Sequence, residues 1–183
     1  MPPPPRAIAP QAPDEPQELT GVDMAGERRP GLELTDAALS DCNLANVHAR
    51  GGSLRRVTVH RCRMTGLLWS EGSLRDVVLR DCRIDLASFA ASKLEQVVFE
   101  SCILRQTDFQ DAGLRAVRFV DCDLTEADLS NARLARCELR GCTLDGVRGA
   151  ESLRGAAMPW ADIVAAAGTF AEALGIGVLD PGD

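Results

Sequence analysis

The chain has 183 residues, a formal net charge of −7 and 45% hydrophobic residues. Its length is that of a single domain, long enough to bury a sizeable core. The acidic balance argues against a general nucleic-acid-binding protein, which is usually strongly basic. No apolar run is long enough to cross a membrane as a helix.

Proline dominates the first part of the chain. Residues 1–30 contain eight of the ten prolines, together with several acidic residues. Such a segment cannot bury enough apolar surface to order itself, so we expect a disordered tail. An irregular first coil from about residue 19 is the alternative, because Leu19 and Met24 keep the phase of the repeat that follows. A proline-rich ligand for a partner is less well supported, because no PxxP motif in this segment is accompanied by a pair of basic residues.

A repeat of five residues runs through residues 31–158. From Leu34 to Gly149 the central residue of each unit is large and apolar, except at Ala49 and Gly149, and the residue two before it is uncharged. Side chains alternate along an extended backbone, so these two residues point to one side and the residue between them points out. The last two residues of each unit must then turn a corner. A fixed short period of this kind predicts a solenoid.

The cysteines and aromatic residues add a longer period. Six cysteines recur every 20 residues from Cys42 to Cys142, and Trp69, Phe89 and Phe109 have the same spacing. Because 20 residues are four units, we predict four sides to each coil. Equivalent residues then stack at the inter-strand spacing of about 4.8 Å, and about six coils make a rod of roughly 29 Å.

This pattern resembles the pentapeptide repeat family, whose consensus is a small residue, Asp or Asn, Leu or Phe, and two variable residues. The clearest matches are Cys42–Asn46 (CNLAN), Thr107–Asp111 (TDFQD), Cys122–Glu126 (CDLTE) and Ala127–Asn131 (ADLSN). The resemblance implies an all-β solenoid, a right-handed quadrilateral β-helix, over residues 31–158. No residue is inserted or deleted from Leu32 to about Val147. In this the chain is similar to the loop-free mycobacterial fluoroquinolone-resistance type rather than to the plasmid-borne members with projecting loops.

All seven cysteines fall in the inward column, where each serves as a small apolar residue. Stacked strands hold side chains farther apart than the Cβ separation of about 3.8 Å that a disulfide needs. Zinc is the alternative, but zinc ligands converge on a point in close pairs, whereas these thiols form a line. The start of the chain, Met1–Pro5, lacks the apolar core of a signal peptide. We expect reduced cysteines, no metal or other cofactor, and a cytoplasmic protein.

Residues 159–183 leave the repeat. Pro159 suits the first turn of a helix, and Gly175 is a natural stop. One face of this helix has residues spaced four, three and four apart: Ile163, Ala167, Phe170 and Leu174. We predict a short strand over residues 176–179 and then a tail. The helix either caps the open strand edges of the last coil or forms a homodimer, as the resemblance implies, since a similar helix pairs two rods in the mycobacterial relatives.

The sequence offers little for catalysis. Its two histidines, His48 and His60, belong to outward positions on adjacent sides of the coil, and neither has a nucleophile in fixed register. No glycine-rich phosphate-binding loop is present in the sequence. We therefore expect that the protein is not an enzyme.

Charged residues are unevenly distributed around the predicted rod. One side gathers basic residues: Arg55, Arg56, Arg75, Lys93, Arg115, Arg133 and Arg136. The opposing sides gather acidic residues in the C-terminal half: Asp108, Asp111, Asp121, Asp123, Glu126 and Asp128. The alternative to a binding role is a solvated surface stabilised by pairs between coils, such as Asp85 near Arg105.

The resemblance gives the acidic cluster a function. Family members that confer fluoroquinolone resistance are similar in shape to duplex DNA and occupy the DNA-binding saddle of DNA gyrase or topoisomerase IV. The six carboxylates match that role, because complementary charge would steer such a rod to a basic groove. The first hypothesis is a protein-binding DNA mimic with DNA gyrase as its partner. A structural or assembly scaffold with an unrelated protein partner is the alternative, and nucleic-acid binding through the basic side is least favoured.

Overall fold

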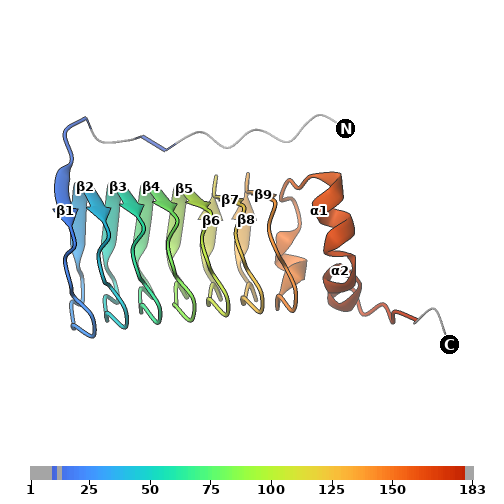
Figure 1. Cartoon of the computed structure of the whole chain (residues 1–183). Helices are drawn as coiled ribbons and strands as arrows, with labels where there is room; N and C mark the ends of the chain where they lie inside the picture. The colour runs from blue at the N-terminus through green and yellow to red at the C-terminus, as the bar shows by residue number, and fades with distance from the viewer. Residues whose placement is uncertain (1–9, 12–13, 180–183) are drawn as a thin grey trace.

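The computed structural model describes residues 10–11 and 14–179, which form one parallel β-solenoid followed by two short helices (Figure 1). Each strand pairs in parallel with residues 20 positions away, as Leu34 with Leu54 and Leu79 with Phe99. Both predicted periods are confirmed, because five residues make one side and four sides make a coil. The strands are β1 (Gln17–Thr20), β2 (Glu33–Ser40), β3 (Ser53–His60), β4 (Ser73–Arg80), β5 (Lys93–Glu100), β6 (Gly113–Arg115), β7 (Arg118–Val120), β8 (Arg133–Ala135) and β9 (Glu138–Arg140).

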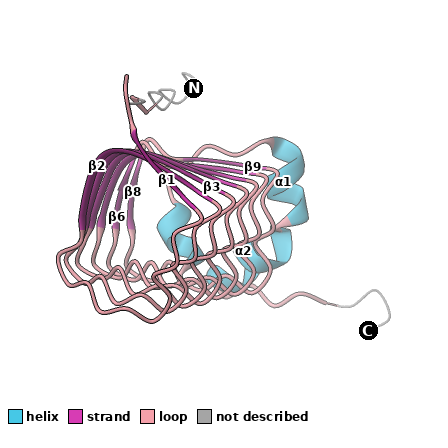
Figure 2. Ribbon diagram, turned by 60° about the vertical axis from the view of Figure 1, so that its left-hand side comes forward, coloured by secondary structure: helices cyan, strands magenta, loops and turns pink. Residues whose placement is uncertain are grey.

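The four sides are named here by their central residues. Face 1 runs from Leu34 to Leu134, face 2 from Leu19 to Leu139, face 3 from Met24 to Leu144 and face 4 from Ala49 to Leu129, each in steps of 20. Strands β2 to β5 bend from face 1 onto face 2, and in later coils this long strand is divided into β6 with β7 and β8 with β9. Faces 3 and 4 are joined between coils by single bridges. Figure 2 shows the sheet along one part of the cross-section and the bridged segments along the rest.

A residue in the left-handed conformation turns the chain at every corner. Each fifth residue from Gly21 to Gly146 has a positive φ, and most of these residues are not glycine. The corner N–H groups donate to the next coil, as from Asn46 to the Thr65 carbonyl at 2.9 Å. Any side chain in this conformation costs about 1–2 kcal/mol, with Asn and Asp tolerated best. The corners therefore hold backbone strain that the stacked hydrogen bonds offset.

The two inward columns form one continuous core along the rod. Phe89 and Phe109 stack on face 4 with ring centroids 5.5 Å apart, and Phe99 and Phe119 stack on face 2 at 5.0 Å. Rings from the two stacks meet edge to face across the interior, as Phe99 does with Phe109 at 6.3 Å. These four rings and the stacked leucines around them are almost fully buried. The predicted inward columns are thus the core.

Two glycines lie where a side chain would collide with face 4: Gly72, an inward residue of face 1, and Gly149, a central residue of face 4. A Cβ on Gly72 would lie 2.5 Å from Trp69 Nε1, so the large indole fits only because this residue has no side chain. The indole N–H is buried without a hydrogen-bond partner in the described part of the chain. At Gly149 a Cβ would lie 2.4 Å from the Ser130 backbone nitrogen, and φ is 67°. Only glycine fits at position 149, the last central position of the regular repeat.

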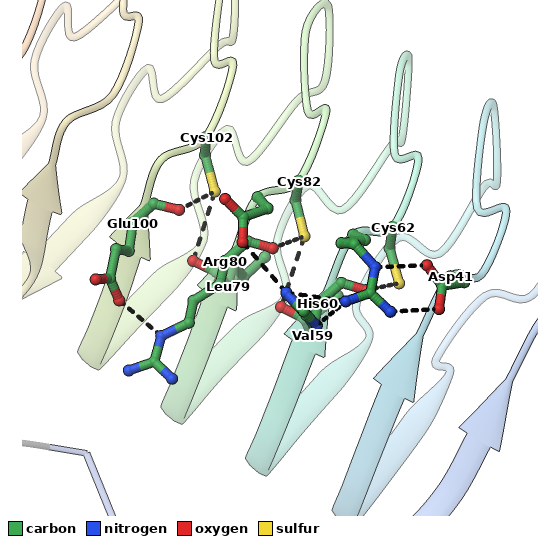
Figure 3. Close-up of polar contacts among 11 residues, drawn as sticks. Asp41, Val59, His60, Cys62, Leu79, Arg80, Cys82, Glu100 and Cys102 are labelled. Atoms are coloured by element: carbon green, nitrogen blue, oxygen red, sulfur yellow. Dashed lines mark hydrogen bonds and ion pairs between the residues drawn. The ribbon is translucent and has the colours of Figure 1, made fainter.

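The cysteine column follows the corner between faces 2 and 3 (Figure 3). The Cys82 thiol donates to the Arg80 carbonyl at 3.1 Å and to the Val59 carbonyl at 3.6 Å, which joins two coils. All seven thiols are free, and burial raises the pKa of Cys62 to about 11. These cysteines are part of the packing, as the inward column predicts. Among the described residues, no group of three or more His, Cys, Asp and Glu side chains could hold a metal ion.

The solenoid begins at Gln17, so its start moves back from the predicted residue 31. Strand β1 pairs with β2 in register, and a bridge joins Asp23 to Asn43. Glu27 and Arg29 break the apolar columns because they lie in the first coil, where they form an ion pair at 2.7 Å with both side chains partly exposed. The predicted disordered tail otherwise falls largely on residues 1–9 and 12–13, which lie outside the described residues.

The C-terminal cap differs from the predicted single helix and strand. A 3-10 helix, η1 (Ala150–Leu153), follows Gly149, and Ala157 forms the last bridge, to Glu138. Two helices then cover the end of the rod, α1 (Trp160–Ala165) and α2 (Ala167–Ala173). Residues 176–179 form no strand and are exposed. Across residues 10–11 and 14–179, none of the helices has the length and apolar character needed to span a membrane.

Candidate interaction surfaces

The six acidic residues predicted for partner binding occupy two kinds of position. Asp108, Asp123 and Asp128 are outward residues of faces 3 and 4, whereas Asp111, Asp121 and Glu126 are corner residues. Asp108 and Asp128 are brought together as a bridged pair on adjacent coils. Asp111 and Asp121 lie at diagonally opposite corners of the coil. The structure therefore spreads the six carboxylates around half of the rod rather than gathering them in one patch.

The outward aspartates have a structural role that the sequence pattern did not reveal. Each accepts a hydrogen bond from the backbone N–H two residues later, as Asp108 does from Gln110 at 2.8 Å and Asp128 from Ser130 at 2.9 Å. Such Asx turns favour the bend that follows the strand. Asn43 does the same on face 3, with the Ala45 N–H at 3.2 Å. An Asp or Asn at this position thus stabilises a corner whether or not a partner binds.

Asp128 is the most tightly held of these carboxylates. The residue is 5% exposed, accepts a hydrogen bond from Gln110 Nε2 at 2.7 Å and lies 3.0 Å from the Arg148 guanidinium. Burial opposes its ionisation, but the hydrogen bonds from Ser130 and Gln110 and the charge of Arg148 hold its pKa below the usual value. Because its carboxylate is buried and already paired, Asp128 can interact only weakly with a partner.

Asp123 on face 3 is held in a similar way. Burial again opposes ionisation, but hydrogen bonds from Thr125 and Arg105 keep its pKa below the usual value. Arg105 pairs with Asp123 at 2.5 Å and not with Asp85, which pairs with Arg83 at 3.0 Å, so the pair predicted from sequence is wrong. Pairs between coils nevertheless stabilise this surface.

The corner carboxylates are exposed. Glu126 accepts a hydrogen bond from Gln106 Nε2 at 2.6 Å, and neither Asp111 nor Asp121 has an ion pair with any described residue. From residue 101 onward, faces 3 and 4 and the corners beside them carry seven carboxylates against two arginines, Arg105 and Arg148. This acidic surface consists of Asp108, Asp111, Asp121, Asp123, Glu126, Asp128 and Asp145.

The predicted basic side is face 1 with the corner that leads to face 2. Arg56 pairs with Asp36 at 2.6 Å, whereas the other cations of this side are paired weakly or not at all within residues 10–11 and 14–179. Arg75 and Arg115 come only to 3.8 Å and 3.7 Å from a carboxylate. Face 1 therefore keeps free positive charge, on the side of the coil opposite face 3.

The four residues predicted for one helix face are divided by a bend at Ala166. Ile163 and Phe170 are half-buried and, together with Leu174, line an apolar hollow of about 310 Å³ beside η1. Ala167 is exposed, and Leu174 is 72% exposed. Ala166 is the buried contact that the spacing missed, at 5% exposure. The bend places this residue against the core, which a straight helix with the predicted face would not do.

The cap and the residues that follow it keep large apolar side chains in solvent. Trp160, Val164, Leu174, Ile176 and Val178 are each more than half exposed. Apolar residues gathered in this way at one end of a protein mark a protein interaction site. The cap is thus a second candidate surface beside the acidic one.

His48 lies on face 4 and His60 on face 2, so the two histidines are on opposite sides of the coil and the predicted adjacent sides are wrong. The His60 imidazole contacts Asp81 at 3.2 Å and Arg61 at 3.0 Å. No described hydroxyl or thiol is hydrogen-bonded to either imidazole. The described residues therefore show no arrangement of nucleophile and base around His48 or His60.

A family model for the pentapeptide repeat region matches residues 52–126 and 80–149, which together are more than half of the chain. The chain belongs to the pentapeptide repeat family. The coils of this pentapeptide repeat protein extend beyond the matched residues in both directions, from Gln17 to the bridge at Ala157. A search of the curated proteins finds no match.

Solved structures of other pentapeptide repeat proteins are similar to this one. Trypsin-treated QnrB1, a plasmid-mediated fluoroquinolone resistance protein, is 17% identical with a TM-score of 0.36, over 90% of this chain and 98% of that one. HetL, involved in heterocyst differentiation regulation in the cyanobacterium Nostoc sp. strain PCC 7120, is 17% identical with a TM-score of 0.34, over 79% and 90%. Rfr23 from the cyanobacterium Cyanothece 51142 is 15% identical with a TM-score of 0.24, over 78% and 88%.

Proposed function

We propose that this pentapeptide repeat protein is a non-catalytic rod that binds another protein through its acidic surface. The observation that supports this is the excess of carboxylates on faces 3 and 4 from residue 101 onward, seven against two arginines. The buried aromatic stacks fix these coils, so the carboxylates stand at set heights, about 4.8 Å apart from coil to coil. Fixed charges of one sign favour a partner of the opposite sign and speed its encounter.

DNA gyrase is the partner that we propose for the acidic surface. A groove that binds duplex DNA is basic, because the duplex has one negative charge per about 1.7 Å of its axis. A rod with outward carboxylates on successive coils is complementary to such a groove. The proposal follows the resemblance to the fluoroquinolone-resistance members, and the exposed Asp111, Asp121 and Glu126 are the residues best placed to contact the enzyme.

The alternative function is that of a structural or assembly scaffold with an unrelated protein partner. The exposed apolar side of the cap favours this alternative, since it is independent of the acidic surface. Both functions are compatible with a homodimer formed through the cap, in which Trp160, Val164 and Leu174 would be covered. Nucleic-acid binding through face 1 remains the least favoured, because the chain as a whole carries a net charge of −7.

A supercoiling assay with purified DNA gyrase tests the first function. The protein is titrated against fixed enzyme and relaxed plasmid, and the variant reverses three corner charges, Asp111→Lys, Asp121→Lys and Glu126→Lys. These residues are exposed, so the rod keeps its fold. We expect inhibition by the natural protein and a loss of at least about tenfold in potency for the variant, equal to about 1.4 kcal/mol.

The matched control reverses three carboxylates outside the acidic surface: Glu33→Lys, Glu71→Lys and Asp81→Lys. This control changes the net charge by the same amount as the test variant. If the position of the carboxylates determines binding, the control should inhibit gyrase as strongly as the natural protein. If both variants lost the same amount of inhibitory potency, the inhibition would depend on net charge and not on the position of the carboxylates. No inhibition by the natural protein at a large excess over enzyme would remove gyrase as the partner, and a scaffold function would then be the one to pursue.

A further inference from the structure

Face 2 carries an apolar column on its outer side, which a solvated sheet face would not need. The outward residues Thr58, Val78 and Val98 stack on β3, β4 and β5. Val98 is only 6% exposed although it points away from the core. Together with neighbouring side chains these residues line a hollow of about 670 Å³ on the outside of the rod. Residues of the chain, with Pro10 among those around the hollow, therefore already lie over this part of the sheet.

The N-terminal segment already reaches this hollow. Pro10 is one of the residues that line it, beside Val78 and Val98. The Gln11 backbone N–H donates to Asp76 Oδ1 at 3.3 Å, and Asp76 is itself 8% exposed. Pro10 and Gln11 therefore lie over coils that come after the one that β1 begins.

The chemistry of the hollow suits a proline-rich segment. Arg118 lies at its edge, and the Arg118 Nε–H is buried without an acceptor in the described part of the chain. Proline has no N–H, so such a segment can lie on apolar side chains without burying unpaired donors, and its carbonyls remain free to accept. The residues before Pro10, Met1–Ala9 (MPPPPRAIA), include four prolines and one large aliphatic residue, Ile8.

The length of the segment is sufficient for the hollow. Nine residues in a polyproline II conformation span about 28 Å, at about 3.1 Å per residue. The hollow extends over β3, β4, β5 and β7, and three inter-strand steps amount to about 14 Å. The segment that ends at Pro10 can therefore cross the whole apolar column.

We propose that face 2 is a docking surface for the chain's own N-terminal segment, residues 2–9. In this arrangement Ile8 packs into the hollow, and a carbonyl of the proline run accepts the Arg118 Nε–H. A protein that binds face 2 must then displace this segment, which leaves the acidic surface and the cap as the freely accessible surfaces. The inference is independent of the proposed gyrase binding, because faces 3 and 4 take no part in it.

Cleavage by trypsin after Arg6 tests the proposal in the full-length protein. The rate of cleavage at the Arg6–Ala7 bond is followed by mass spectrometry and compared with that of a synthetic peptide of residues 1–16. Docking should slow cleavage in the protein by about tenfold or more, because the bond is cut only while the segment is released. Val98→Glu and Val78→Glu, made separately, should each restore the rate of the free peptide.

Leu68→Glu is the control, because Leu68 is an exposed outward leucine on face 4. It should leave the bond as protected as in the natural protein. Circular dichroism confirms that each variant is folded, and two face 2 variants keep the test valid if one of them is not. Cleavage of the natural protein at the peptide rate would overturn the proposal, as would protection that survives both valine variants. If the protection of the Arg6–Ala7 bond disappeared when the protein was diluted, face 2 would bind a second copy of the chain, and the proposal would also be overturned.

Discussion

The backbone strain at the corners predicts that replacing a corner alanine by glycine stabilises the rod, whereas the same replacement at the preceding residue destabilises it. Ala91 is an exposed corner residue with a φ of 54°. An L-residue in this conformation costs about 1–2 kcal/mol, which glycine avoids. Glycine also makes the unfolded chain more flexible, at a cost of about 0.5–1 kcal/mol. Ala91→Gly should therefore raise the free energy of unfolding by about 0.5–1 kcal/mol.

Ala90 is the matched control, since it precedes Ala91 and its φ is not positive. Ala90→Gly has the same entropic cost without relief of strain, so it should destabilise the rod by about 0.5–1 kcal/mol. Thermal unfolding followed by circular dichroism measures both variants. For a chain of this size the two midpoints should move apart by roughly 2–8 °C, with Ala91→Gly above the natural protein. Equal destabilisation by both would refute strained corners, because the corner would then behave as ordinary extended backbone.

Three further predictions concern the core and an outward carboxylate. Phe109→Ala should lower the free energy of unfolding by about 3–5 kcal/mol and Phe109→Leu by much less, because alanine leaves a cavity in the ring stack; equal losses in urea titrations would contradict this packing. Gly72→Ala should cost about 1–3 kcal/mol by displacing Trp69, with a shift in tryptophan emission, whereas Gly113→Ala on the same face, which meets nothing within 4 Å, should be neutral or stabilising. Asp128 has a lowered pKa, so its contribution to stability is present above the unfolded value of about 3.9 and is lost as the pH falls through the folded value. Asp128→Asn should flatten the pH dependence of the melting temperature below about pH 5, and an unchanged profile would show that another group titrates there.

The sequence determined the register of the solenoid because each inward position is repeated in every coil. If one unit has an atypical central residue, as at Ala49, the equivalent residues 20 positions before and after it still define the register of the repeat. This redundancy ends at both termini. Glu27 and Arg29 are charged residues at positions that are uncharged in the later coils. They are tolerated as an ion pair because the first coil has no coil before it.

The cap was harder to predict because it has no repeat to correct it. The spacing of Ile163, Phe170 and Leu174 is compatible with one straight helix, and propensity does not reveal the bend. Packing decides the outcome instead: the bend puts Ala166 into the core, and the Thr169 hydroxyl donates to the Leu144 carbonyl at 3.0 Å. That carbonyl belongs to the last coil. The pattern of residues in the cap does not reveal which groups at the edge of this coil the cap will contact.

The acidic cluster was predicted only in part, because two physical causes place carboxylates on this fold. At outward positions an Asp accepts the N–H two residues later, as Asp123 does from Thr125 at 3.1 Å, so the fold itself favours it. At the corners any residue must adopt a positive φ, and glycine would be least strained. Asp is tolerated there better than most side chains, so the fold explains Asp111 and Asp121 in part, whereas it gives no reason for a glutamate such as Glu126. Reversing Asp123 or Asp128 would damage the rod and any binding together, whereas reversing Asp111, Asp121 and Glu126 separates the two, and a binding function must be sought at these corners.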